Sequence, residues 1–176
     1  MKLLSEKIVN TDKYAGTVDL ITGIDDFKEQ VDYDDEWHTY RLNGKIIPSV
    51  TQLLDDGEYD KVDKDLLKYA SDKGKIVHKE IETYFKTGNF GFSGEFYEFL
   101  YIYTNNEELF NSASIFDFKT YSVATPINRF KCYQQIKMYA EAVKYLTGKE
   151  IKSYYLIHLP HNGKGRVYDL RKEFEK

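Results

Sequence analysis

The segment 115–120, with the sequence Ile-Phe-Asp-Phe-Lys-Thr, is the part of the chain that most narrows the choice of fold. Side chains alternate between two faces along a β-strand, so Asp117 and Lys119 share one face while Phe116 and Phe118 share the other. The two phenylalanines would anchor the strand in a core, and the acid and the lysine would project together at its exposed end. Taken alone, such a pair is more typical of a solvated ion pair on an edge strand than of a catalytic site.

Apolar spacing and turn residues divide the remaining chain into short strands and helices. The expected strands are 6–10 and 14–21, which form a hairpin, 38–42 and 45–47 around an Asn43-Gly44 turn, 114–120, 151–159 and 166–170. The expected helices are a short one with Ser49 as N-cap, 63–71, 73–85, 94–110, and 128–146, which ends before Gly148. This mixture predicts an α/β (α+β) fold.

The composition excludes several kinds of site and partner. The chain has 176 residues, 41% of them hydrophobic, which suits one globular domain. Its single cysteine, Cys132, excludes an intramolecular disulfide, a four-cysteine zinc site and an iron–sulfur cluster, and a reducing cytoplasm is the expected compartment. No segment approaches the roughly 20 apolar residues of a membrane helix. The net charge of −4 argues against a general polyanion binder.

Three further patterns accompany the Asp117-Lys119 pair. Asp19 is a lone acid in an apolar strand. A carboxylate in such a place is costly unless it is paired or holds a cation. The alternative is an acid at the strand end that caps a turn. His78 and Glu82 are four residues apart on one helix face, where a hydrogen-bonded, partly buried histidine is the more common outcome. Gln135 and Tyr139 are also four apart, and such a pair is usually an ordinary polar stripe beside a core face.

Together, the four patterns resemble the RecB-type branch of the PD-(D/E)XK nucleases, which includes phage recombination exonucleases. That branch has a helix G-x-x-x-H, a strand G-x-x-D, a strand D-x-K and a helix Q-x-x-x-Y. In this sequence the patterns are Gly74–His78, Gly16–Asp19, Asp117–Lys119 and Gln135–Tyr139. The segment 47–51 is also similar to the lead-in of that group. The resemblance extends from Glu6 to about Leu159, and it implies a restriction-endonuclease-like core with a small mixed central sheet flanked by helices.

The order of the motifs departs from the family pattern. In the family the histidine helix precedes the G-x-x-D strand, which leads directly into D-x-K, whereas here the hairpin comes first. We therefore expect a single domain over residues 1–176, with a displaced core β-hairpin at 1–22, an acidic linker at 23–36, and helices plus the remaining core at 37–176. The linker would lead from the hairpin back to the helices, or a neighbouring copy would supply the hairpin by domain swapping.

The resemblance implies Mg²⁺ or Mn²⁺ bound by Asp19, Asp117 and the backbone carbonyl of Phe118, with no iron–sulfur cluster. His78 would be an additional ligand that favours Mn²⁺, because imidazole is a softer donor than oxygen. Lys119 would orient or deprotonate the attacking water, or stabilise the developing charge.

Other residues have supporting roles in this scheme. Gln135 and Tyr139 would contact the substrate or position Lys119. The candidates for substrate binding are Ser49, Thr120, Arg129, Lys131 and Lys137, and the secondary acids are Glu82 and Glu6. The expected partner is DNA. A homo-oligomer and a recombination partner protein are compatible with the scheme, and no membrane is involved.

Both exonucleases and endonucleases fit these motifs, and an exonuclease acting in DNA recombination, repair or phage DNA processing is the expected activity. One alternative is a catalytically inactive DNA-binding module of the same fold. Another is a protein-interaction module whose tyrosine-rich surface binds a partner. A metal-free RNA-binding protein would need a basic aromatic platform that this sequence lacks. Metal dependence separates the nuclease from the alternatives.

Overall fold

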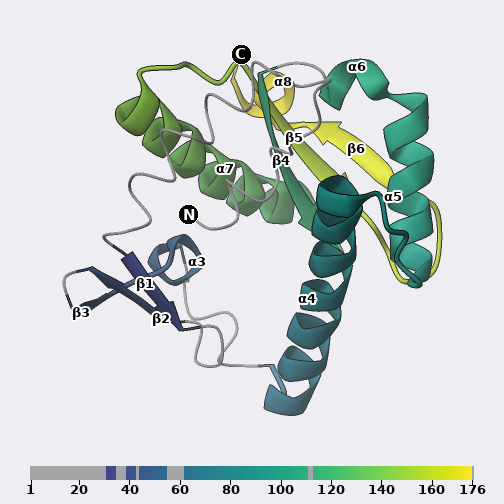
Figure 1. The fold of residues 1–176 in the computed structure, drawn as a ribbon, viewed down its shortest axis with the longest axis horizontal. Coiled ribbons are helices and arrows are strands. Elements are labelled where there is room, and N and C mark those ends of the chain that lie inside the picture. The colour runs from purple at the N-terminus through teal and green to yellow at the C-terminus, as the bar shows by residue number, and fades with distance from the viewer. Residues whose placement is uncertain (1–30, 35–38, 43, 55–61, 111–112, 176) are drawn as a thin grey trace.

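The computed structural model describes residues 31–34, 39–42, 44–54, 62–110 and 113–175 (Figure 1). These residues form a mixed α+β fold with two three-stranded sheets. This confirms the fold class expected from the sequence. The predicted N-terminal hairpin, with Glu6, Gly16 and Asp19, lies outside the described residues.

The larger sheet is built from β4 (Ser114–Lys119), β5 (Ser153–His158) and β6 (Arg166–Asp169), in that order. β4 and β5 are parallel, whereas β5 and β6 are antiparallel, so the sheet is mixed. A parallel pair needs a long crossover connection, and α7 (Pro126–Thr147) supplies it between β4 and β5. The expected small mixed sheet is therefore present.

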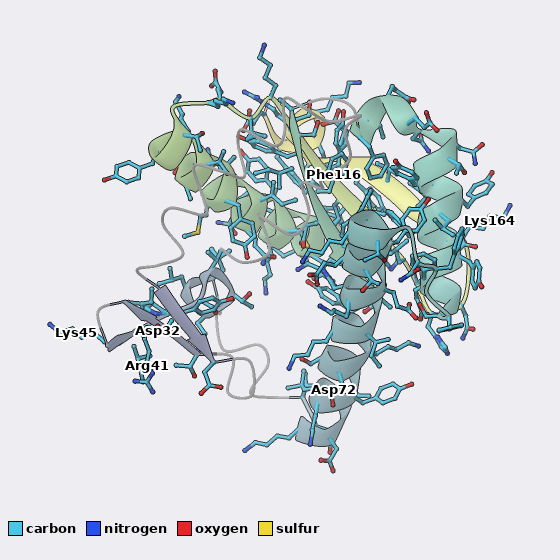
Figure 2. All side chains as sticks on the ribbon, viewed as in Figure 1. Asp32, Arg41, Lys45, Asp72, Phe116 and Lys164 are labelled. Carbon is cyan, nitrogen blue, oxygen red and sulfur yellow. The ribbon has the colours of Figure 1, made fainter. Side chains whose placement is uncertain are left out.

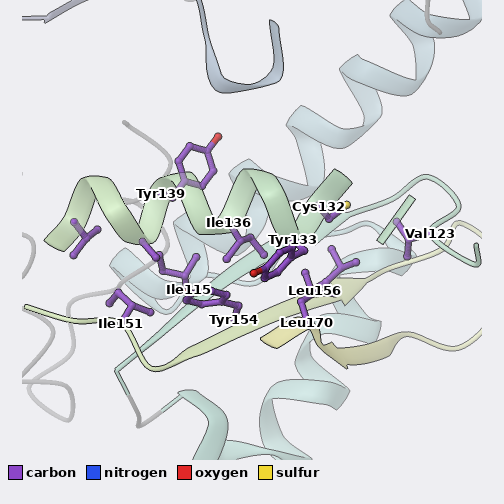
Figure 3. Packing of buried hydrophobic residues seen from close by; sticks show 12 residues of the cluster. Ile115, Val123, Cys132, Tyr133, Ile136, Tyr139, Ile151, Tyr154, Leu156 and Leu170 are labelled. Atoms are coloured by element: carbon purple, nitrogen blue, oxygen red, sulfur yellow. The ribbon is translucent and has the colours of Figure 1, made fainter. Parts of the chain in front are cut away.

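One face of this sheet packs against α7 and against α8 (Leu170–Phe174). Ile115 of β4 and Leu156 of β5 meet Ile136 of α7 in a cluster of buried side chains (Figure 3). Because side chains alternate along β4, this is also the face that carries Asp117 and Lys119. The crossover helix therefore covers the part of the sheet that holds the D-x-K pair.

The opposite face packs against α4 (Lys64–Thr87), α5 (Gly94–Asn105) and α6 (Glu107–Phe110). Phe116 and Phe118 point into this second cluster, as the alternation along the strand predicts. Figure 2 shows Phe116 inside the molecule, while charged side chains such as those of Asp72 and Lys164 lie at its surface. Helices thus flank the sheet on both sides.

A smaller antiparallel sheet precedes α4. The predicted hairpin is confirmed as β2 (Thr39–Leu42) and β3 (Lys45–Ile47), and Gly44 in the turn has φ of 76°. Ser49 is the N-cap of α3 (Val50–Leu53), as expected, in a reciprocal capping arrangement with Gln52. Val50 packs against the cluster beneath α7, which attaches this short helix to the rest of the fold.

The prediction of a linker at 23–36 is wrong for residues 31–34. These residues form β1 (Val31–Asp34), which pairs with β2 and places Asp32 opposite Arg41. Apolar and acidic residues alternate in Val-Asp-Tyr-Asp with the period of a strand, but the acidic composition of the whole segment conceals this pattern. Opposite charges across an antiparallel pair favour the pairing.

The two helices predicted at 63–71 and 73–85 are one helix. α4 begins after the N-cap Asp63 and ends at Gly88, which has φ of 75°. Neither glycine nor proline separates the two predicted segments, and Asp72 between them is compatible with a helix interior, so the helix continues.

The last two corrections concern element ends. The helix predicted at 94–110 divides at Asn106, whose φ of −140° separates α5 from α6. The last strand stops at Asp169, whose side chain caps α8, so Leu170 is helical rather than extended. Within the part of the chain that the structure describes, we find no helix with the length and apolarity of a membrane span.

Candidate active site

Asp117 and Lys119 form a buried pair at the end of β4. The Nζ atom of Lys119 lies 2.9 Å from Oδ2 of Asp117, and Asp117 is only 2% exposed. A solvated ion pair on a sheet edge would be open to water, and this pair is not. A buried carboxylate with a lysine beside it is the kind of arrangement that functional sites use, although structural ion pairs can have it as well.

α7 adds two polar side chains to this pair. Lys119 donates a hydrogen bond of 3.0 Å to Oε1 of Gln135, and Nε2 of Gln135 donates one of 2.9 Å to the hydroxyl of Tyr139. Asp117, Lys119, Gln135 and Tyr139 therefore form one continuous chain of polar contacts. The polar residues of α7 are not an independent stripe, because they meet the D-x-K pair directly.

α4 brings His78 to the other edge of β4. Nε2 of His78 lies 2.8 Å from the backbone oxygen of Phe118. The carbonyl of Lys119 accepts a hydrogen bond from Leu159, which directly follows β5. Successive carbonyls of a strand point to opposite edges, so the Phe118 oxygen faces away from β5 and toward α4. His78 and the carbonyl that follows Asp117 thus meet at this edge.

Gly74 lies one helical turn before His78. A Cβ atom placed on Gly74 would have only the hydroxyl of Thr120 within 4 Å, at 3.7 Å. The absence of a side chain therefore leaves open space beside the end of β4. Thr120 itself is half-buried and follows Lys119 directly. The G-x-x-x-H pattern of the sequence thus corresponds to one face of α4 that lines the end of the D-x-K strand.

The electrostatics of the cluster follow from burial and from the Asp117 carboxylate. Burial alone would lower the pKa of Lys119, but the adjacent carboxylate outweighs it, and the net pKa lies well above the ordinary value. Burial raises the pKa of the Tyr139 phenol, and the hydrogen bond with Gln135 offsets part of this effect. At neutral pH, Lys119 is therefore a charged donor and Tyr139 a neutral phenol.

The donors at the β4 edge suit a divalent cation. A carbonyl oxygen only accepts, so at 2.8 Å Nε2 of His78 donates a hydrogen bond to the Phe118 oxygen, and a cation held by both atoms would take the place of that proton. Among the described residues, no three His, Cys, Asp or Glu side chains group as a metal site. A complete site would need an oxygen ligand beyond Asp117, His78 and the Phe118 carbonyl. Asp19, the predicted source, lies outside the described residues.

Two other predicted residues have different partners. Glu82 is paired with Lys79 and Lys86 on α4, and these lysines lower its pKa even though burial alone would raise it. The structure does not bring Glu82 to Asp117. The Ser49 hydroxyl accepts a hydrogen bond from the Gln52 amide, so its observed role is to cap α3.

The basic residues predicted to contact phosphate differ in their surroundings. The guanidinium of Arg129 binds Glu173 and the backbone oxygens of Val123 and Ala124, so it joins α7 to α8 and to the preceding loop. Lys131 is half-buried on α7. Lys137 is exposed, with Nζ 5.8 Å from the centre of the Tyr133 ring. Phosphate binding by these three residues stays a prediction, and Arg129 already has a structural role.

Two residues beside Lys119 were not predicted from the sequence. His158 ends β5 and is the direct strand partner of Lys119. Tyr121 follows β4, and the centre of its ring lies 5.7 Å from Nζ of Lys119. Tyr121 lies only two residues after Lys119, so the sequence alone could have indicated that it is close to the D-x-K pair. His158 had no such signal, because the register between two strands is not contained in either of them.

Comparisons with protein-family models, with curated proteins and with solved structures yield no significant match. The fold and the site therefore define a mixed α+β protein with a buried polar cluster at the end of β4, an edge strand of the described sheet.

Proposed function

We propose that this protein is a Mg²⁺- or Mn²⁺-dependent DNA nuclease of the PD-(D/E)XK type. The observation that carries the proposal is the convergence of three sequence motifs. Asp117 and Lys119, the Gln135–Tyr139 pair and His78 come from a strand and two helices, and they meet around the end of β4. None of these sequence patterns by itself requires its residues to lie beside those of the other two in the folded chain.

The residues of the cluster suit phosphodiester hydrolysis. A divalent cation, when bound, would activate water and neutralise charge on the phosphate. Asp117, His78 and the Phe118 carbonyl are the described donors for it, and Asp19 is the proposed further ligand. Lys119 holds its ammonium group beside Asp117, where it can donate to a phosphate oxygen as negative charge develops.

Gln135 and Tyr139 would act mainly by positioning. The Gln135 amide accepts from Lys119 and donates to Tyr139, so it fixes the direction of the lysine side chain relative to α7. Correct placement of a charged donor before the reaction is a large part of electrostatic catalysis. The family resemblance supports an exonuclease role in DNA recombination, repair or phage DNA processing.

The test is cleavage of an end-labelled linear duplex and a labelled single strand with Mg²⁺, with Mn²⁺ and with EDTA. Wild-type protein should cleave only with a cation, and Asp117→Asn and Lys119→Met should each reduce the rate by at least about 100-fold. Asp19→Asn tests the proposed further ligand. Glu141→Ala and Lys144→Ala remove exposed charges from α7 and should leave the rate unchanged.

Circular dichroism and calorimetric titration with Mn²⁺ accompany each variant, because breaking a buried ion pair can cost about 3–5 kcal/mol of stability. A folded Asp117→Asn protein that binds no Mn²⁺ and does not cleave supports the proposal. Cleavage that is indifferent to EDTA or to both substitutions would contradict it. If folded wild-type protein neither binds Mn²⁺ nor cleaves DNA, an inactive DNA-binding module or a protein-interaction module becomes the better explanation of its function.

A further inference from the structure

Tyr121 is an exposed aromatic residue directly beside the buried cluster. Its ring centre is 5.7 Å from Nζ of Lys119, yet the residue is 45% exposed. The neighbouring members of the cluster differ in this respect, because Asp117 and Tyr139 are buried. Tyr121 is therefore partly exposed to solvent beside Lys119, the residue that the proposed function places at the phosphate.

The position of Tyr121 is defined by contacts on several sides. Its hydroxyl lies 3.9 Å from Sγ of the buried Cys132 on α7, and its ring contacts the Lys119 ammonium. The imidazole of His158 hydrogen-bonds to the Tyr121 backbone. His158 is itself the strand partner of Lys119, so both residues are fixed relative to the same point of the sheet. An aromatic ring held in this way loses little conformational entropy when it binds a planar partner.

We propose that Tyr121 stacks on a nucleobase of the DNA strand whose phosphate lies at Lys119. The proposal rests on the proposed function and adds the form of the substrate to it. Bases inside a duplex cover one another's faces, so a ring in this position can stack only on a base with an exposed face, in a single strand or at a duplex end. Tyr121 thus favours single strands and duplex ends over duplex interiors at the site.

Tyr145 provides a matched control. It is 88% exposed and lies on the same helix as Gln135, ten residues later, which is about 15 Å along the helix axis. If the exposure of a tyrosine were sufficient for DNA binding, Tyr145 would contribute as much as Tyr121. The proposal assigns the effect to Tyr121, because of these two exposed tyrosines it is the one that adjoins Lys119.

The experiment measures binding and cleavage separately. Fluorescence anisotropy of a labelled single-stranded oligonucleotide in Ca²⁺ reports affinity, and cleavage in Mn²⁺ reports kcat and KM. The proteins are wild type, Tyr121→Ala, Tyr121→Leu, Tyr121→Phe and Tyr145→Ala. A second set of oligonucleotides carries a single abasic site at successive positions, so that one base at a time is removed.

Tyr121→Ala and Tyr121→Leu should weaken binding and raise KM by about tenfold, with a smaller change in kcat. Tyr121→Phe, which keeps the ring, and Tyr145→Ala should stay within about twofold of wild type. One abasic position should weaken wild-type binding and leave Tyr121→Ala unaffected, because the stacking partner is already missing.

Two results would overturn the inference. If wild type cleaves DNA in a metal-dependent way and Tyr121→Ala is indistinguishable from it on every oligonucleotide, the nuclease proposal stands and the stacking role fails. If wild type neither binds nor cleaves any DNA, both fail together. Melting curves of each variant show whether the fold is retained, and the leucine variant keeps the apolar area of the site if the alanine variant is unstable.

Discussion

Gln135 is the residue on which the geometry of the polar cluster most depends. Its amide accepts a hydrogen bond from Lys119 and donates one to Tyr139, so it is bonded to both groups. Gln135→Leu keeps most of the side-chain volume and removes both hydrogen bonds. We expect kcat to fall by about 10- to 100-fold, the usual cost of losing a partner that orients a catalytic group, with a small change in melting temperature.

Gln134 is the matched control for that substitution. It is adjacent in sequence and also half-buried, but it points in another direction on α7. Gln134→Leu should retain wild-type kcat in the same cleavage assay. If kcat falls equally in both variants, this part of α7 is generally sensitive to substitution. The specific positioning role of Gln135 would then be contradicted.

Sequence patterns predicted those site residues whose relationship is local. Asp117 and Lys119 share a strand face, and Gln135 and Tyr139 share a helix face, so the periodicity of each element identifies them. Arg129 was assigned to phosphate although its partner is Glu173, 44 residues later. A contact over that distance depends on how α8 folds back, and α8 itself was not predicted.

At the level of elements, α4 has a glycine in its interior whose side-chain space is open. A Cβ atom on Gly74 would make only an ordinary contact with Thr120, at 3.7 Å. Gly74→Ala should stabilise the protein by about 0.4–1 kcal/mol, because alanine favours the helix and restricts the unfolded chain. Urea unfolding measures this change. If the open space admits substrate, the same variant should lose cleavage rate while it gains stability.

Gly91 provides the contrasting case in the loop before α5. A Cβ atom there would lie 2.7 Å from the side chain of Glu80, which accepts hydrogen bonds from the backbone amides of Phe92 and Ser93. Glu80 would have to give up these bonds to make room. Gly91→Ala should therefore destabilise the protein by about 1–3 kcal/mol in the same unfolding measurement. Stabilisation by this variant would contradict the described loop geometry.

Element types were easier to predict than element ends. The hairpin with Gly44 in its turn and the Ser49 cap depend on the chemistry of one or two residues, and both are confirmed. The continuity of α4 and the strand at 31–34 depend on what each segment packs or pairs with. Tertiary and cross-strand contacts of that kind outweigh local preference and are not visible in a single sequence window.

At the scale of the whole molecule, Glu95 ties three parts of the fold together. It is 3% exposed at the start of α5, and it pairs with Lys73 of α4 and with His161 in the β5–β6 loop, each at 3.0 Å. Burial alone would raise the pKa of Glu95, but hydrogen bonds from its own backbone and from these two partners lower it below the usual 4.5. The charged form is therefore the one that stabilises the fold.

The direction of the pH effect follows from this lowered pKa. Folding favours the carboxylate, so its contribution is present above about pH 4.5 and is lost as the pH falls through the folded-state pKa. Glu95→Gln should cost about 1–3 kcal/mol at pH 7 and much less near pH 3, measured by urea unfolding. Glu108→Gln, at an exposed position of α6, should show no such difference. A Glu95→Gln protein as stable as wild type at pH 7 would contradict the role of this pair.

The pairing of Asp117 with Lys119 also affects how a cation would reach the site. The buried carboxylate already has a positive partner from its own strand, at 2.9 Å. Among the described residues, the charge of Asp117 is therefore balanced by that of Lys119. If Asp117 holds the proposed cation, its carboxylate would be shared between that cation and the ammonium group of Lys119. In the proposed nuclease, the affinity of Asp117 for a cation would therefore depend on how strongly Lys119 holds the same carboxylate, and a phosphate that engages Lys119 would weaken that competition.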